Sequence, residues 1–436
     1  MAKFSVWTFG CRCNQADSAA IREDLCRLSM QECENHLDAD LVVINTCTVT
    51  HRTDQRVRQA VRRLHRENPD ARLVLTGCYA ERDPETLAAI PGVSLVVGNA
   101  KRESLPEILA EQESALHGHI IHSPIESRSD YVLRPMAQTG GKTRPLIKLQ
   151  DGCDARCSYC IVPHVRGPGR SARPENVLAE IESLVERGFQ EIVLTGVHLG
   201  AFGRKLKSRI RLIDLLRRIL EIPRLGRIRL SSIEPMQFDR AIVNLAANSP
   251  IFARHFHIPM QSGSNRILRL MRRPYKAAQF QDLLLHIHEK LPDAGLGTDV
   301  VVGFPGETDE DFSETCKLIQ QSPLTYLHVF PFSPREGTAA WSLPGRVPSR
   351  VMKGRVDQLL KISRDKNLAF RRRFVDCVLP AITLSKGECI GTSIALTDNY
   401  INAKIPGNSL PANRLINIRI EDVRPDSTLA RDNPHK

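Results

Sequence analysis

Three cysteines lie within eight residues of one another: Cys153, Cys157 and Cys160, spaced C-x3-C-x2-C. One loop with this spacing can present three thiolates to three corners of an iron–sulfur cubane. No fourth cysteine follows nearby, which leaves one iron open for another ligand, as a catalytic cluster requires. Zinc is the rival metal, but zinc sites generally use four protein ligands. His164 is the only nearby residue that could be the fourth.

A second set of cysteines is spread over the first third of the sequence. Each follows an apolar, strand-like segment; they are Cys11, Cys47 and Cys78. The carboxyl ends of parallel strands meet at one sheet edge, where doubly wound folds bind ligands. Cysteine is also a common core residue, but three at equivalent strand ends favour a second cluster. Cys13 lies two residues beyond Cys11, and either could be the ligand; we favour Cys11 because it directly follows the strand end.

The pattern of strands and helices predicts an α/β fold in which both sets lie at strand ends. Over residues 1–115 short apolar segments alternate with amphipathic helical ones, which predicts a doubly wound domain. Residues 116–143 are rich in His, Ser, Pro and Gly and are predicted to be a linker. Six further strand–helix units follow over 144–373, fewer than the eight of a closed barrel. We therefore expect a partial (β/α)6 barrel.

The end of the sequence has a different pattern. Short strand-like segments separated by Gly and Asn predict a small antiparallel β domain over 374–425. Residues 426–436 are predicted to be a disordered tail.

Charge and hydropathy narrow the possible partners and compartments. The net charge is +12, with arginines concentrated in 52–66 and 371–373, which fits a nucleic-acid partner or simply a solvated basic surface. No apolar run approaches the roughly 18 residues that span a bilayer. The N-terminus lacks a signal-peptide pattern, so we expect a cytoplasmic protein with no membrane partner. Twelve cysteines in that reducing compartment indicate metal binding rather than disulfides.

Several segments resemble a known family. TFGCRCNQADS, INTCTVT, LTGCYAE and DGCDARCSYCIVPHVRGPGRS resemble the methylthiotransferases of the radical S-adenosylmethionine (SAM) superfamily. LTGVHLGAFG, HIPMQSGSNRILRLMRR and DVVVGFPGET resemble the branch that modifies N6-threonylcarbamoyladenosine at position 37 of tRNA. The branches acting on isopentenyladenosine or on a ribosomal-protein aspartate remain alternatives. A non-catalytic iron–sulfur RNA-binding protein is a further alternative.

The resemblance implies two 4Fe–4S clusters, SAM, tRNA and a flavodoxin-type electron donor. Cys11, Cys47 and Cys78 would hold the sulfur-handling cluster, and the later triad would cleave SAM to a radical, which attacks C–H bonds that resist acid–base chemistry. Other SAM contacts are expected at strand ends, namely at Gly196, Ser232, Glu234, Gln261 and Gly303. Arg166 and Arg170 are expected to meet a carboxylate or phosphate. The C-terminal β segment takes the place of the family's RNA-binding barrel, although it is short and not strongly basic.

Overall fold

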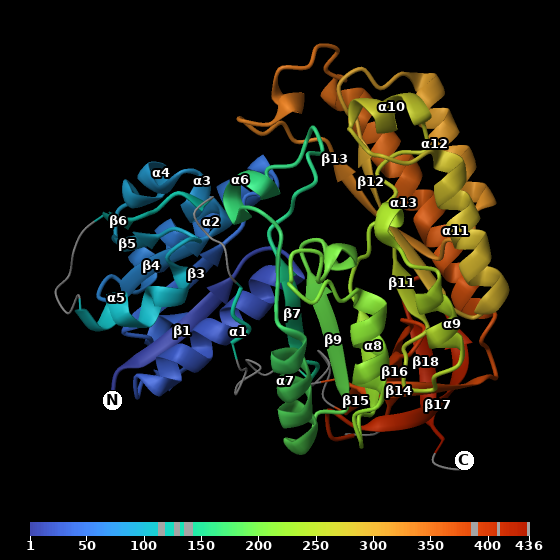
Figure 1. Ribbon diagram of the computed structural model, residues 1–436, viewed down its shortest axis with the longest axis horizontal. Coiled ribbons are helices and arrows are strands. Elements are labelled where there is room, and N and C mark those ends of the chain that lie inside the picture. Colours follow the sequence, from blue (N-terminus) through green and yellow to red (C-terminus); the bar gives the residue numbers. More distant parts are fainter. Residues whose placement is uncertain (112–117, 126–130, 135–142, 385–390, 408–409, 434–436) are drawn as a thin grey trace.

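The computed structural model describes residues 1–111, 118–125, 131–134, 143–384, 391–407 and 410–433. It contains an N-terminal α/β domain, a larger strand–helix barrel and a small C-terminal β barrel (Figure 1). Among the described residues, no helix is both long and apolar enough to cross a membrane.

The N-terminal domain is a parallel sheet covered by helices on both faces. Its strand order is β2-β1-β3-β4-β5-β6. The strands are β1 (Lys3–Thr8), β2 (Gln31–Glu32), β3 (Leu41–Thr46), β4 (Arg72–Gly77), β5 (Val93–Val97) and β6 (His119–Ile121). One face packs on α1 (Arg12–Arg27) and α5 (Leu105–Glu111), the other on α2 (His51–Glu67), α3 (Cys78–Arg82) and α4 (Pro84–Ala88). The doubly wound prediction is confirmed.

One part of the expected linker belongs to this sheet. Residues 119–121 form β6, which pairs in parallel with residues 95–97 of β5. A three-residue edge strand is too short to show a period in the sequence, because its position is set by pairing with its neighbour. Residues 116–117, 126–130 and 135–142 of the expected linker lie outside the described part of the chain.

The second domain is the expected open barrel. Its six parallel strands are β7 (Leu146–Asp151), β9 (Glu191–Gly196), β10 (Arg227–Leu230), β11 (His255–His257), β12 (Gly295–Val302) and β13 (Tyr326–Pro331). The bridges Ile228–Phe252 and Ser232–His257 join β10 to the β11 side. The helices that follow the strands are α7 (Pro174–Glu186), α8 (Leu212–Leu220), α9 (Ala241–Ala247), α11 (Ala277–Lys290), α12 (Asp309–Gln321) and α13 (Ser349–Arg372). The last helix leads into the C-terminal domain.

The N-terminal domain packs against the β7 side of the barrel. Helix α1 lies between β1 and β7 (Figure 1), and its Ala19 is part of the barrel's apolar core. Helix α3 packs on α6 (Val162–Arg166), the short helix that follows the second cysteine loop. The two cysteine-bearing sheet edges therefore face a shared region.

The C-terminal domain is a closed barrel, in the order β14-β15-β16-β18-β17. Its strands are β14 (Val378–Thr383), β15 (Thr392–Thr397), β16 (Asn402–Pro406), β17 (Leu415–Val423) and β18 (Thr428–Asp432). The predicted tail is wrong for 428–432, because β18 pairs antiparallel with β17 and parallel with β16. Its own sequence is weakly apolar, and it is held because it removes the two open edges of the sheet.

A loop of the C-terminal domain closes the amino end of the larger barrel. The fully buried Arg229 donates to the carbonyl oxygens of Thr397 and Asp398, both at 3.0 Å. The ring of Tyr400 stacks on His255, with ring centroids 4.0 Å apart. The C-terminal domain is thus anchored at the end of the barrel opposite the cysteine loops.

We expect Glu191→Ala to destabilise the amino end of the larger barrel strongly. Glu191 is fully buried and pairs with Arg229 at 2.8 Å, Arg144 at 3.2 Å and Arg227 at 3.4 Å. Burial raises the pKa of Glu191, but the guanidiniums outweigh it and hold the pKa at about 2. Removing the carboxylate leaves buried cations unpaired, which costs about 3–5 kcal/mol of unfolding free energy.

Urea unfolding checks this, with Lys361→Ala as the control. Lys361 forms an exposed pair with Asp365 on α13, so its loss changes stability by at most about 1 kcal/mol. Because the pKa of Glu191 is lower in the folded than in the unfolded state, its ionised form adds to the free energy of unfolding above pH 4.5. This contribution is lost as the pH falls toward 2. Equal effects of the two substitutions would contradict the role given to Glu191.

Candidate active site

The later cysteine triad lies in the loop between β7 and α6, at the carboxyl end of the first barrel strand. Gly152 has φ +70°, and a Cβ there would lie 2.1 Å from the carbonyl oxygen of Pro168, so only glycine fits. The amide of Cys153 donates to the carbonyl of Gly167 at 3.0 Å, and that of Ser158 to Met271 at 3.1 Å. These backbone hydrogen bonds fix both ends of the loop.

Polar groups of the barrel surround the three thiols. His198 Nδ1 lies 3.4 Å from Cys153 Sγ, and Arg273 Nη1 donates to Cys157 Sγ at 3.3 Å. Burial raises the pKa of Cys153 to about 11 and that of Cys160 to about 12. Metal binding must therefore displace protons from these thiols, and the guanidinium of Arg273 compensates part of the resulting negative charge.

The thiols of each triad are spread more widely than three ligands of a single tetrahedral ion would be. Two thiolates on one tetrahedral zinc lie about 3.8 Å apart, given Zn–S bonds of about 2.3 Å. Across the described residues, the only trio of His, Cys, Asp or Glu ligand atoms lying mutually within 4.8 Å is that of His257, Asp299 and His328. Neither cysteine triad is that compact.

The upstream triad converges at the carboxyl edge of β1, β3 and β4, as predicted. Asn14 links the three strand ends: its Nδ2 donates to the carbonyls of Phe9 at 2.8 Å and Thr46 at 2.9 Å. Its Oδ1 lies 3.8 Å from Cys11 Sγ and 3.9 Å from Cys78 Sγ. Asn14 is fully buried, so these loops are fixed around one side chain.

Cys47, the third cysteine of the upstream triad, lies beside Gly10, the residue before Cys11. Gly10 has φ +109°, and a Cβ there would lie 2.9 Å from Cys47 Sγ. A larger residue would therefore push into the thiol. Cys13, the alternative ligand, is buried within α1, whereas Cys11 is exposed.

Cys11 and Cys13 should differ sharply in reactivity. A hydrogen bond from Cys13 lowers the pKa of Cys11 to about 6, and the same bond raises the pKa of Cys13. Because the thiolate is the nucleophile, iron-free protein should be alkylated first at Cys11. The rate should rise as the pH passes through about 6 and level off above pH 7. Peptide mass spectrometry after timed iodoacetamide treatment measures this; faster labelling of Cys13 would contradict the assignment.

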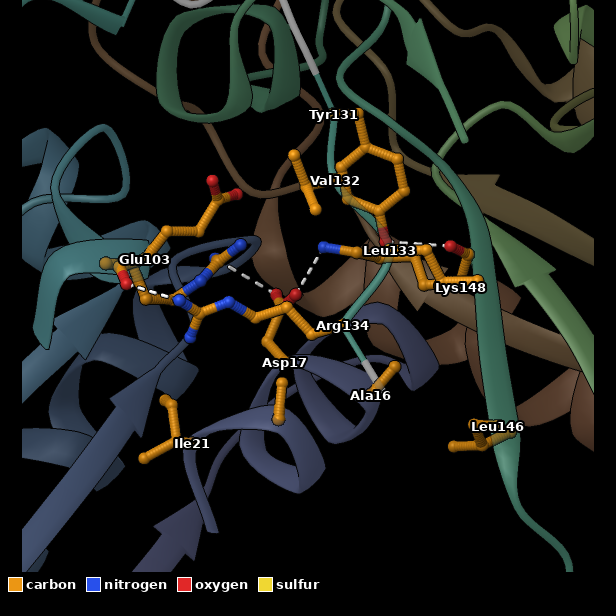
Figure 2. Close-up of a pocket in the computed structure, with 12 residues that line it drawn as sticks. Ala16, Asp17, Ile21, Glu103, Tyr131, Val132, Leu133, Arg134, Leu146 and Lys148 are labelled. Atoms are coloured by element: carbon orange, nitrogen blue, oxygen red, sulfur yellow. Dashed lines mark hydrogen bonds and ion pairs between the residues drawn. The ribbon is translucent and has the colours of Figure 1, made fainter. Parts of the chain in front are cut away.

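Charged side chains are buried where the two domains meet. Asp17 of α1 pairs with Lys148 of β7 (Figure 2), with Arg102 at 3.1 Å and with Arg166 at 2.9 Å. Arg166 also pairs with Asp151 at 2.8 Å. Arg166 and Arg170, which were expected to meet a carboxylate or phosphate, are both buried and pair with the carboxylate of Asp151, a residue of the same chain. These contacts join segments far apart in the sequence, which no local pattern reveals.

Two cavities of about 240 Å³ adjoin the later cysteine loop. One is lined by Cys157, His198 and Gln237. The other lies between the two cysteine loops; its lining includes Val49, Thr50, Tyr159, Cys160, Gln261, Asp299 and Phe332. Val49 and Thr50 follow Cys47 closely, so residues next to both triads line this cavity. We call it the inter-loop cavity.

The expected SAM contacts have different surroundings. Gln261 lines the inter-loop cavity, with φ +68°, an uncommon value for a non-glycine residue. Glu234 pairs with Arg273, the donor to Cys157. Glu234 and the remaining three, Gly196, Ser232 and Gly303, line neither of the two cavities described above.

Sequence reasoning missed Asp299. Its Oδ1 accepts from His257 Nε2 at 2.9 Å and His328 Nδ1 at 3.1 Å. These groups lower the pKa of Asp299, against the effect of burial, and keep it ionised. The available signal was a lone charge within the otherwise apolar strand GLGTDVVV.

The comparisons with known proteins agree with this site. Residues 147–319 match the family model described as the radical SAM superfamily, and residues 3–98 match the one described as uncharacterized protein family UPF0004. The fold is similar to that of a Kitasatospora setae radical SAM methyltransferase, TsrM, solved with cobalamin and a [4Fe-4S] cluster. The TM-score is 0.57 at 16% identity, covering 78% of this chain and 77% of that one. Together with the cysteine loop, the barrel defines a radical SAM enzyme.

Two curated relatives narrow the class. A Bacillus subtilis protein named threonylcarbamoyladenosine tRNA methylthiotransferase MtaB is 35% identical, over 96% of this chain and 94% of its own. A Sulfurihydrogenibium tRNA-2-methylthio-N(6)-dimethylallyladenosine synthase is 31% identical, over 97% of both chains. The chain belongs to the radical SAM methylthiotransferase family. Its cofactors are SAM and two 4Fe–4S clusters.

Proposed function

We propose that this enzyme inserts a methylthio group at carbon 2 of N6-threonylcarbamoyladenosine 37 in tRNA. The observation that carries the proposal is the inter-loop cavity, because residues next to both cysteine triads line it. A nucleoside there would meet the radical source and the sulfur source together. The substrate branch is supported by identity and coverage taken together. The Bacillus subtilis threonylcarbamoyladenosine relative is 35% identical over 96% of this chain, whereas dimethylallyladenosine relatives are 35% identical over 84% of it or 31% identical over 97% of it.

In this proposal the two triads have separate tasks. Cys153, Cys157 and Cys160 hold the cluster that binds SAM, and Cys11, Cys47 and Cys78 hold the cluster that handles sulfur. When bound, the first cluster and SAM supply a 5′-deoxyadenosyl radical able to remove hydrogen from an unactivated carbon. Arg273 offsets the charge of Cys157, and Glu234 holds Arg273 in place.

The inter-loop cavity also offers contacts for SAM. Asp299, held ionised by His257 and His328, can accept hydrogen bonds from ribose hydroxyls. The amide of Gln261 lies on the same wall. Gly196, Ser232 and Gly303 stay predictions, based on their places at or beside the strand ends.

Exposed cations on α2 support tRNA as the partner. The arginines exposed on this helix are Arg52, Arg56, Arg62, Arg63 and Arg66. Phosphate contacts of this kind supply much of the affinity for nucleic acids. Arg371 was expected to be available for tRNA, but it is buried and donates to the carbonyls of Arg424 and Ser427, where it fastens α13 to the C-terminal barrel. The flavodoxin-type electron donor stays a prediction.

Nucleoside mass spectrometry tests the function. A strain deleted for this gene should lose 2-methylthio-N6-threonylcarbamoyladenosine, and the wild-type gene should restore it. Cys157→Ala and Cys47→Ala should not restore it, whereas Cys316→Ala should, because Cys316 is buried on α12 away from both triads. Loss of only the 2-methylthio-isopentenyl nucleoside would favour that branch. Unchanged tRNA would point to the protein-modifying branch or to a non-catalytic protein.

Asp299→Ala should weaken SAM binding to the reconstituted enzyme. Losing a charged hydrogen-bond acceptor costs about 1.5–3 kcal/mol, which is a roughly 10- to 100-fold increase in Kd. Equilibrium dialysis with labelled SAM measures it. Asp282→Ala is the control, because Asp282 is an exposed residue of α11 that pairs with the exposed Arg240. An unchanged Kd for Asp299→Ala would exclude Asp299 from the SAM site.

A further inference from the structure

One side chain of the barrel reaches the upstream cysteine triad. Arg166 ends α6, six residues beyond Cys160, and is 3% exposed. Its Nη2 donates to Asn14 Oδ1 and pairs with Asp17 at 2.9 Å, while its Nη1 pairs with Asp151 at 2.8 Å. The guanidinium thus spans the domain interface, from the residue before the later cysteine loop to the residue around which the upstream triad is arranged.

Arg166 shares its contact atom with the upstream cysteines. Asn14 Oδ1 receives the guanidinium and also lies within 4 Å of the sulfurs of Cys11 and Cys78. Both amide hydrogens of Asn14 are committed to the carbonyls of Phe9 and Thr46. The orientation of Asn14 is therefore fixed, and Arg166 meets the only atom of this amide that is left to face the thiols.

The contact between Arg166 and Asn14 brings a cation close to the upstream cysteines. Three thiolates and a cluster place net negative charge in a buried site, which is costly unless cations compensate. Arg102, Lys148 and Arg166 each pair with both Asp17 and Asp151. Of these three cations, Arg166 is the one that also contacts Asn14 Oδ1, the atom that faces the sulfurs of Cys11 and Cys78.

We propose that Arg166 is a positioning residue of the upstream cluster, supplied in cis by the barrel. It fixes Asn14 between the cysteine loops and compensates the charge of the thiolates. The N-terminal domain alone then lacks part of its own cluster site, which is complete only when the barrel is docked. The inference rests on the assignment of Cys11, Cys47 and Cys78 as ligands.

The test uses full-length chain in which Cys153, Cys157 and Cys160 are alanine, so that only the upstream cluster remains. After anaerobic reconstitution this parent should hold about four irons per chain, as one 4Fe–4S cluster requires. Adding Arg166→Gln should cut the iron content at least twofold and move the midpoint potential of the remaining cluster to a more negative value, because a compensating cation is gone. Arg166→Lys keeps the charge and should retain a potential close to that of the parent.

Arg102→Gln is the matched control. Arg102 is a buried cation of the same interface and pairs with Asp17 and Asp151. Its hydrogen-bonding amide is Asn99 rather than Asn14. It should leave both iron content and potential near those of the parent. If Arg166→Gln alone does not fold, Arg166→Gln with Asp17→Asn restores the charge balance of the interface and replaces it in the comparison.

The outcomes distinguish the assignment of the upstream ligands from the role of Arg166. A parent without about four irons would overturn the assignment of the upstream ligands, and with it this part of the proposed function. A parent with its cluster, together with an Arg166→Gln variant of unchanged iron content and potential, would overturn the role of Arg166 alone. Equal losses in the Arg166→Gln and Arg102→Gln variants would reduce Arg166 to a structural interface residue.

Discussion

The ion pairs between α1 and the barrel hold the two cysteine loops in one arrangement. Asp17, Lys148, Asp151 and Arg166 are all buried. Asp17 pairs across the domain interface with Lys148 and Arg166, and these two cations also pair with Asp151 within the barrel. A shift of one domain along the other that left Asp17 buried without these cations would cost several kcal/mol. Asp17 belongs to the helix that begins beside Cys11, and Asp151 directly precedes the later cysteine loop. One buried network therefore sets the distance between the two sites.

The two ends of the larger barrel have different roles. At the carboxyl ends of the strands lie the cysteine loop, the inter-loop cavity and the N-terminal domain. At the amino ends, Glu191 and Arg229 fasten the C-terminal barrel through Thr397 and Asp398. One further contact joins the C-terminal barrel to α1, because Arg12, the residue after Cys11, donates to the hydroxyl of Tyr400 at 3.0 Å.

The main elements of the fold could be predicted because their signals are local. β3 is buried along its whole length and β12 along most of it. A strand that is buried on both faces needs apolar residues at nearly every position, so it is visible in the sequence as an apolar run. β6 and β18 were missed for the opposite reason. They are three and five residues long and exist because a neighbouring strand offers unpaired backbone groups, a property of the neighbour rather than of their own sequences.

The sequence by itself determined the two cysteine triads and the class of chemistry. The C-x3-C-x2-C spacing is a property of one loop, and the strand ends before Cys11, Cys47 and Cys78 can be read from apolar segments. Tertiary structure alone decided which other side chains join these sites. Arg166 contacts Asn14 across 152 positions of sequence, and Asp299 reaches the inter-loop cavity from the strand after His257. Such contacts arise from the docking of separately formed elements, so no spacing along the chain encodes them.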